Sequence, residues 1–148
     1  MDVPFDEVTE AVLVRMTRLT RYLRRASQES IQQAGLQDYE YATLHQLMVR
    51  DTPGHASPSE LAADLGISGA GMTGRLDALE RSGWIERHAS VDDRRRIDIK
   101  VTKSGAEIWR KAMTLREQVD DSLTSALTDE EKSTLAGLLK KMAIKLDQ

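Results

Sequence analysis

The 148-residue sequence contains no cysteine. Disulfide bonds, thiolate metal sites and thiol-based redox switches are therefore excluded, because each of them needs a cysteine sulfur. Histidine is also scarce: His45, His55 and His88 stand alone, without the HxxxH or HxxE spacing that brings metal ligands together. We expect neither a metal site nor any other cofactor.

Long apolar runs and catalytic motifs are missing as well. No stretch approaches the ~20 apolar residues that cross a bilayer, and the acidic N-terminus, Met1–Asp6, has no signal-peptide core. We therefore expect no membrane partner and a cytoplasmic location. The sequence has no Gly-x-Ser-x-Gly, Walker A or HExxH pattern, so we do not expect an enzyme.

The chain lacks an excess of positive charge. Its formal net charge is −3, and residues 55–105 hold eight basic and eight acidic side chains. Bulk charge therefore cannot provide affinity for nucleic acid, which would have to come from local basic clusters. Hydrophobic residues make up 40% and charged residues 30%, which is ordinary for a single domain over 1–148.

Two short capped helices stand in the middle of the sequence. Ser57 and Glu60 form a capping box, with a proline between them at the first helical position, and predict a helix over 58–65. Ser68 is the N-cap of a second helix that continues to about residue 82. Met72, Leu76 and Leu79 fall on one face of this helix, and we expect that face to dock on Leu61 and Leu65 of the first helix. Two capped helices joined by a tight turn are typical of a helix-turn-helix.

A predicted β-hairpin follows these helices directly. Residues 84–87 predict one strand, and 97–101 predict a half-buried strand in which three apolar residues alternate with polar ones. The segment between them, 88–96, is a polar tip. A hairpin in this place is a wing, so we expect residues 38–102, which begin with a helix over 38–50, to form a winged helix-turn-helix lobe.

Long amphipathic helices flank this lobe. Apolar residues at helical spacing predict a helix over 6–33, another over 103–126 and a last one opened by the capping box at Thr128. The first helix would be about 40 Å long. The rest of a chain of this size cannot bury the apolar faces of several such helices along their whole length. We expect segments 6–35 and 103–147 to pair with a second copy. The expected fold class is mainly α with a small β-wing.

The second helix of a helix-turn-helix reads DNA with its N-terminal half, which here is small and uncharged. We expect Asp77 to pair with Arg81 at i,i+4. The arginines of the tip can enter a narrow minor groove, where one of the preceding aspartates can hold a guanidinium. The candidate DNA contacts are Ser57, Ser59, Ser68, Ala70, Gly71, Thr73, Gly74, Arg75, Asp93, Arg94, Arg95 and Arg96.

Residues 57–105 resemble the MarR-type (multiple antibiotic resistance regulator) transcription factors. The matching stretches are SELA (59–62), TGRLDALERSG (73–83) and DRR (93–95), with Val101-Thr102 and Gly105 after them. The resemblance implies a homodimeric regulator on palindromic double-stranded DNA. It also implies that Arg95 enters the minor groove, oriented by Asp93.

The resemblance further implies a repressor released from its operator by a small-molecule effector bound between the two modules. Candidate effector contacts, which combine a ring or a charge with positions near the hinge, are Arg15, Tyr22, Tyr41, His45 and Trp109. The alternative is a winged-helix protein-interaction module without DNA binding. The neutral charge of residues 55–105 favours it, whereas the arginines of the wing argue against it.

Overall fold

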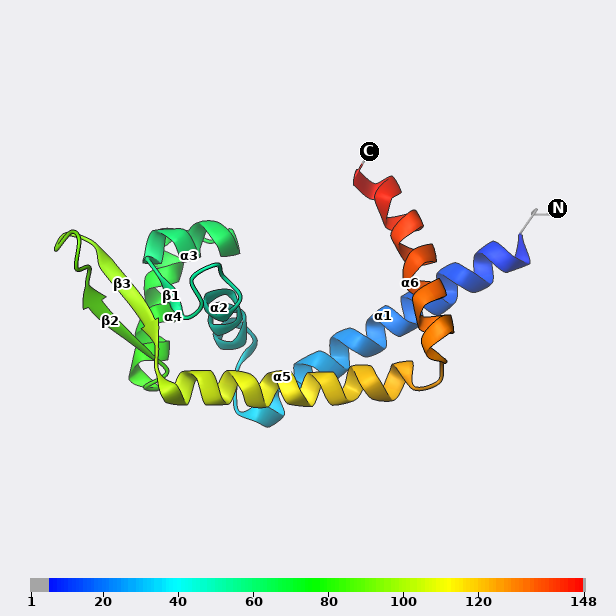
Figure 1. Ribbon diagram of the computed structural model, residues 1–148, viewed down its shortest axis with the longest axis horizontal. Coiled ribbons are helices and arrows are strands. Elements are labelled where there is room, and N and C mark those ends of the chain that lie inside the picture. Colours follow the sequence, from blue (N-terminus) through cyan, green and yellow to red (C-terminus); the bar gives the residue numbers. More distant parts are fainter. Residues whose placement is uncertain (1–5, 148) are drawn as a thin grey trace.

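The computed structural model describes residues 6–147; residue 148 and residues 1–5, which carry most of the acidic N-terminus, lie outside the described residues. The chain is mainly α with a small β-wing, as predicted (Figure 1). The elements in order are α1 (Glu7–Ala34), α2 (Asp38–Met48), β1 (His55–Ala56), α3 (Pro58–Leu65), α4 (Gly69–Arg81), β2 (Ile85–Ala89), β3 (Ile97–Val101), α5 (Lys103–Thr124), α6 (Asp129–Ala143) and the 3-10 turn η1 (Ile144–Asp147).

The molecule divides into a lobe and an extended set of long helices. Helices α2, α3 and α4 and the sheet form the lobe at one end, and α5 extends from beneath it along α1 (Figure 1). The chain then turns back into α6. Within residues 6–147, no helix is both long and apolar enough to cross a membrane, and no group of three acidic or histidine side chains could hold a metal ion.

The predicted helix starts are confirmed by their hydrogen bonds. In the capping box of α3, the Ser57 hydroxyl oxygen accepts from the Glu60 N–H at 3.3 Å, and the Glu60 carboxylate accepts from the Ser57 N–H at 2.7 Å. The Ser68 hydroxyl oxygen accepts from the Gly71 N–H at 3.1 Å at the start of α4. The predicted box at Thr128 also forms. These bonds satisfy N–H groups that a helix start otherwise leaves without partners.

The structure corrects four sequence predictions, three in the sheet and one in α2. β1 was not predicted; it pairs with β3, which also pairs with β2, so that the antiparallel order is β1-β3-β2. The first wing strand runs over 85–89 rather than 84–87, and Ile97 at the outer end of β3 is exposed although Ile99 is fully buried. Helix α2 ends at Met48, two residues before the predicted end.

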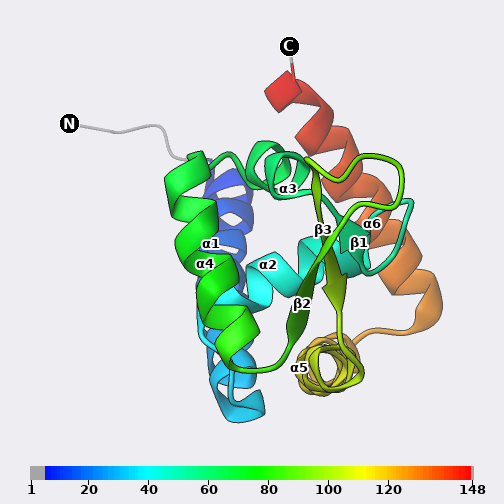
Figure 2. The same cartoon turned by 90° about the vertical axis from the view of Figure 1, so that its left-hand side faces the viewer.

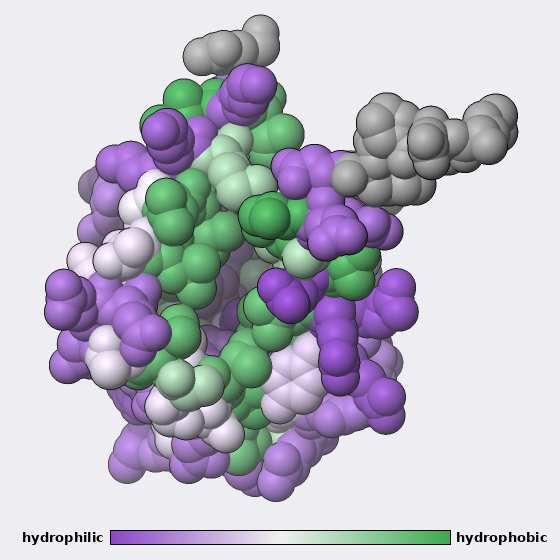
Figure 3. Space-filling model, turned by 90° about the vertical axis from the view of Figure 1, so that its right-hand side faces the viewer, coloured by the Kyte–Doolittle hydropathy of each residue, from purple (hydrophilic) through white to green (hydrophobic). Residues whose placement is uncertain are grey.

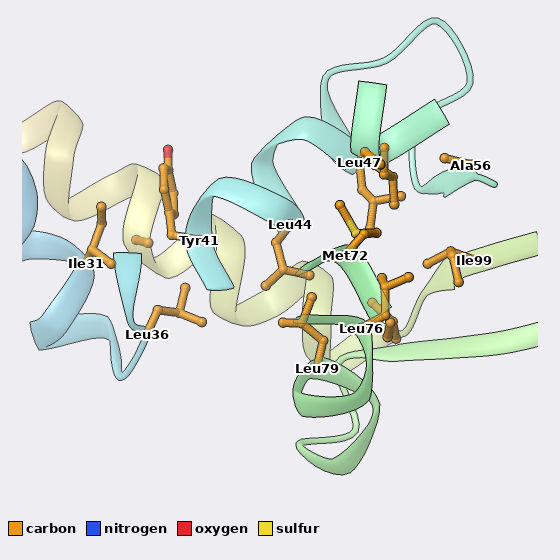
Figure 4. Close-up of a cluster of buried hydrophobic side chains, with 14 of the residues drawn as sticks. Ile31, Leu36, Tyr41, Leu44, Leu47, Ala56, Met72, Leu76, Leu79 and Ile99 are labelled. Carbon is orange, nitrogen blue, oxygen red and sulfur yellow. The ribbon is translucent and has the colours of Figure 1, made fainter. Parts of the chain in front are cut away.

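The core of the lobe lies between α2, the helix-turn-helix and the sheet (Figure 4). The predicted docking of α4 on α3 through Met72, Leu76 and Leu79 is confirmed, because these three side chains and Leu61 are buried. Burying one such side chain stabilises the fold by about 1.5–3 kcal/mol. The fully buried larger side chains are Leu44, Leu47, Leu61, Met72, Leu76, Leu79, Ile85, Ile99 and Thr43.

The start of α5 is fastened to the turn between α4 and β2. The Thr102 N–H donates to the Trp84 carbonyl at 3.0 Å, and the Thr102 hydroxyl donates to the Gly83 carbonyl at 2.7 Å. Gly105 lies so close to this turn that a Cβ would stand 2.1 Å from the Trp84 carbonyl oxygen. The long helix therefore begins in direct contact with the end of the helix-turn-helix.

Candidate nucleic-acid interface

The exposed face of α4 carries little side-chain bulk. Ala70, Thr73 and Gly74 are all exposed, and a Cβ added at Gly69 or Gly74 would meet no atom within 4 Å. Packing within the chain therefore does not require glycine at these two positions. The small residues leave a flat helix face that can approach a DNA groove closely. The Thr73 hydroxyl donates to the Gly69 carbonyl at 3.0 Å, so its oxygen stays free to accept.

The wing tip presents three exposed arginines, Arg94, Arg95 and Arg96. The Asp93 carboxylate accepts from the backbone N–H of Arg95 at 2.9 Å, and its other oxygen lies 4.0 Å from Nε of Arg96. The backbone N–H of Arg96 donates to the Asp93 carbonyl at 2.9 Å. Asp93 therefore orders the backbone of the tip, and in the described residues its carboxylate does not pair with the Arg95 guanidinium.

An open groove brings the wing tip next to the start of α3. Ser57 and Ser59 line one side, and Arg95 and Arg96 line the other. The sequence candidates of α3 and of the wing thus meet, although more than thirty residues separate them. Glu60 also lines the groove; hydrogen bonds with Ser57 lower the pKa of its carboxyl, and the nearby Arg50 and Arg96 lower it further.

Arg75 does not point away from the lobe. Its side chain is half-buried, and its guanidinium carbon lies 5.9 Å from the ring centroid of Tyr39 on α2. A cation over an aromatic face at this distance is attracted to the ring. As a DNA contact, Arg75 would have to leave Tyr39 and swing outward.

The predicted ion pair between Asp77 and Arg81 is wrong. Nε of Arg81 donates to the backbone carbonyl of Asp77 at 3.3 Å, whereas the Asp77 carboxylate pairs with Arg87 of β2. Sequence spacing alone favoured the i,i+4 partner, but the strand that follows α4 folds back and delivers a closer guanidinium. Arg87 was not predicted as a functional residue.

Three of the five candidate effector contacts come together between α2 and α5. The rings of Tyr41 and His45 stack with centroids 5.3 Å apart, and Nε1 of Trp109 donates to Nδ1 of His45 at 3.2 Å. Arg116, which the sequence reasoning missed, donates to the Tyr41 hydroxyl at 2.7 Å. Its spacing of seven from Trp109 places both on one face of α5 and was the available signal.

This cluster disfavours the protonated form of His45. Burial lowers the pKa of His45, and the positive charge of Arg116 lowers it further. The two remaining candidates are not part of the cluster: Arg15 and Tyr22 lie on the exposed part of α1. Tyr22 lines a separate shallow depression with residues of α1 and with Val119 of α5.

Comparisons with known proteins agree with this geometry. A family model described as "MarR family" matches residues 34–96. Transcriptional repressor MprA of Escherichia coli K12 is 38% identical over 91 residues, which cover 62% of this chain and 52% of that protein. HTH-type transcriptional regulator PecS of Dickeya dadantii is 28% identical over 131 residues, which cover 88% and 79%. The chain thus spans about half the length of MprA.

Solved structures match almost the whole chain. Wild-type MarR of E. coli is similar with a TM-score of 0.70 at 26% identity, covering 96% of this chain and 98% of that one. YusO of Bacillus subtilis has the same fold, with a TM-score of 0.82 at 23% identity and coverages of 95% and 98%.

Proposed function

The chain belongs to the MarR family, and from that premise we propose that it is a homodimeric, sequence-specific DNA-binding transcriptional regulator. Its proposed mode of action is repression: the dimer occupies a palindromic operator and leaves it when a small molecule binds. The observation that carries the proposal is the common placement of the flat face of α4 and the arginines of the wing. The start of α4, α3 and the wing tip lie along one edge of the lobe (Figures 1 and 2).

This edge fits a DNA duplex in two grooves. α4 would enter the major groove with Ala70, Gly71, Thr73 and Gly74, while Ser57, Ser59 and Ser68 at the helix starts, joined by Arg75, would approach phosphates. The wing would reach the adjacent minor groove with Arg95, flanked by Arg94 and Arg96, and Asp93 would orient it. A solved structure of MepR from S. aureus, similar in fold at 24% identity, is bound to an oligodeoxyribonucleotide.

Exposed apolar faces on the long helices support dimerisation through segments 6–35 and 103–147. α6 has no buried residue, so its apolar stripe lacks a partner among residues 6–147. Figure 3 shows hydrophobic side chains gathered around a hollow at this end of the molecule. A monomer rarely exposes an apolar surface of this kind. The exposed residues are Val8, Val12, Leu13, Val14, Leu19, Tyr22 and Leu23 on α1, and Leu135, Leu138, Leu139 and Met142 on α6.

The cluster of Tyr41, His45, Trp109 and Arg116 supports an effector at the junction of α2 and α5. It combines aromatic faces with a cation, which suits a small aromatic acid. α5 begins in contact with the end of the helix-turn-helix. A ligand that shifts α5 relative to α2 would therefore change the distance between the two winged helix-turn-helix lobes of the dimer. Another S. aureus MepR structure, also 24% identical, is bound to ethidium bromide.

The test begins with a duplex that the wild-type protein selects from a random-sequence library. If Arg75, Arg94 and Arg96 of each protomer contact phosphate, the dimer makes six such contacts, and the logarithm of the binding constant should fall with the logarithm of the salt concentration at a slope of about −5. Arg95→Ala should weaken binding at least about tenfold. The control, Arg110→Ala, changes an exposed arginine on α5 far from the wing and should have little effect.

The second candidate function, a protein-interaction module, is favoured by the neutral charge of residues 55–105. It predicts that no duplex is enriched, or that binding is independent of salt. Either result would replace the regulator proposal.

A further inference from the structure

Arg87 joins strand β2 of the wing to helix α4. Its guanidinium donates to the Glu80 carboxylate through Nε at 3.0 Å and through Nη2 at 2.8 Å, and Nη2 also pairs with Asp77. One side chain of β2 therefore bridges two carboxylates that lie three residues apart on α4. The Arg87 side chain is only 25% exposed. Both bonds to Glu80 end on the same oxygen, Oε2. Hydrogen bonds between ionised partners are about twice as strong as neutral ones, so this contact favours a fixed position of Arg87 on α4.

The position of Arg87 in the sheet separates it from the arginines of the tip. Side chains alternate along a strand, so Arg87 shares a face with the buried Ile85 and stands opposite Ile99. This face packs toward α4. The side chains of β2 after Ile85 are exposed or half-buried. Among the side chains of β2, Arg87 is the one that forms hydrogen bonds or ion pairs with α4 within residues 6–147.

We propose that Arg87 is a positioning residue that sets the angle between the wing and α4 without contacting DNA itself. The inference rests on the proposed function, because the wing is useful only if Arg95 reaches DNA while α4 lies in its own groove. The hairpin acts as a lever: its base is fixed by Ile85 and Arg87, and its tip carries Arg95. A small rotation at the base displaces the tip by more.

A rival role for Arg87 is direct binding of a phosphate. The two roles differ in what the carboxylates of α4 do. A phosphate-binding arginine would be released by Asp77→Asn together with Glu80→Gln, and DNA binding would strengthen. A positioning arginine would lose its anchor in the same double variant, and DNA binding would weaken.

The first experiment needs no DNA. Because the chain has no cysteine, Val91→Cys at the wing tip, where the native side chain is 99% exposed, carries a single fluorescent label. Time-resolved anisotropy then measures nanosecond motion of the tip. Arg87→Ala should increase the amplitude of this motion, the Asp77→Asn/Glu80→Gln variant should do the same, and Arg87→Lys should restore part of the order.

Arg50→Ala is the matched control. Arg50 also pairs with two carboxylates, Glu60 and Asp64, but it joins the turn after α2 to α3, and neither ion pair involves the wing. Its removal should leave the motion of the tip unchanged. An unchanged tip in Arg87→Ala would overturn the proposal, and so would equal mobilisation by both arginine variants, which would indicate general loosening of the lobe.

The second experiment is a double-mutant cycle on the selected duplex. In the wild-type background, Arg95→Ala should reduce affinity at least about tenfold. In the Arg87→Ala background it should cost less than about threefold, because an unanchored wing no longer delivers Arg95. Full additivity would overturn the positioning role. If no duplex binds at all, the proposed function fails, while the anisotropy measurement still decides whether Arg87 anchors the wing.

Discussion

Gly105→Ala offers a sharp test of how the lobe is joined to the long helices. A Cβ at this position would stand 2.1 Å from the Trp84 carbonyl oxygen and 2.9 Å from its carbon. To reach an ordinary contact of 3.4 Å, the two backbones must separate by about 1.3 Å. The neighbouring atoms are backbone, so no side-chain rotation can relieve the clash.

The magnitude follows from the bonds that this separation breaks. Thr102 and Ser104 donate three hydrogen bonds to the carbonyls of Gly83 and Trp84, at 2.7–3.0 Å. Overpacking costs about 1–3 kcal/mol, and each lost hydrogen bond costs about 1 kcal/mol. Alanine regains up to about 1 kcal/mol of helix propensity. We expect a net loss of about 3–5 kcal/mol in the free energy of unfolding.

Urea unfolding followed by circular dichroism, at equal protomer concentration, measures this loss. A melting scan should show a drop of roughly 6–20 °C. Gly74→Ala is the matched control, because it lies in a helix and a Cβ there meets nothing within 4 Å. It should stabilise the fold by about 0.5–1 kcal/mol. Surface substitutions ordinarily change the free energy of unfolding by up to about 0.5 kcal/mol. If Gly105→Ala changes it by no more than that, the inferred close contact between the start of α5 and the turn before β2 is wrong.

Three further predictions concern pH, assembly and capping. Because burial and Arg116 lower the pKa of His45, the unfolded chain takes up its proton first as the pH falls; stability should be full above about pH 6.5 and decline below it. His45→Asn should flatten this decline in thermal scans from about pH 7.5 to 5. On exposed α6, Leu138→Glu should shift sedimentation toward the 16.6 kDa monomer, whereas Val91→Glu on the wing should not. Ser57→Ala should cost about 1 kcal/mol in urea unfolding, because it removes the N-cap of α3.

Features that depend on neighbours in the sequence were predicted well. The capping boxes and the buried face of α4 follow from spacings of three or four residues, and each was confirmed. The strands were predicted less well. β1 has only two residues, too few to show a periodicity, and exists because His55 and Ala56 pair with Lys100 and Ile99.

Charge pairing shows the same division. Sequence spacing assigned Asp77 to Arg81, yet its carboxylate binds Arg87, ten residues away. The Asp77 carboxylate could pair with either arginine, and the choice between them depends on where the wing folds back onto α4. Nothing in the local sequence encodes that angle.

The sequence by itself determined the order of the helices, the helix-turn-helix and the cluster of arginines on the wing, because hydrogen-bonded caps and hydrophobic periodicity act over a few residues. Only the tertiary structure decided that Arg87 of β2 pairs with Asp77 and Glu80 of α4, and that Gly105 lies too close to Trp84 for a side chain. It also decided which effector candidates meet: Trp109 reaches His45 across 64 residues and Arg116 reaches Tyr41 across 75. Contacts at such separations depend on how whole helices pack, and a pattern read along one chain does not contain that information.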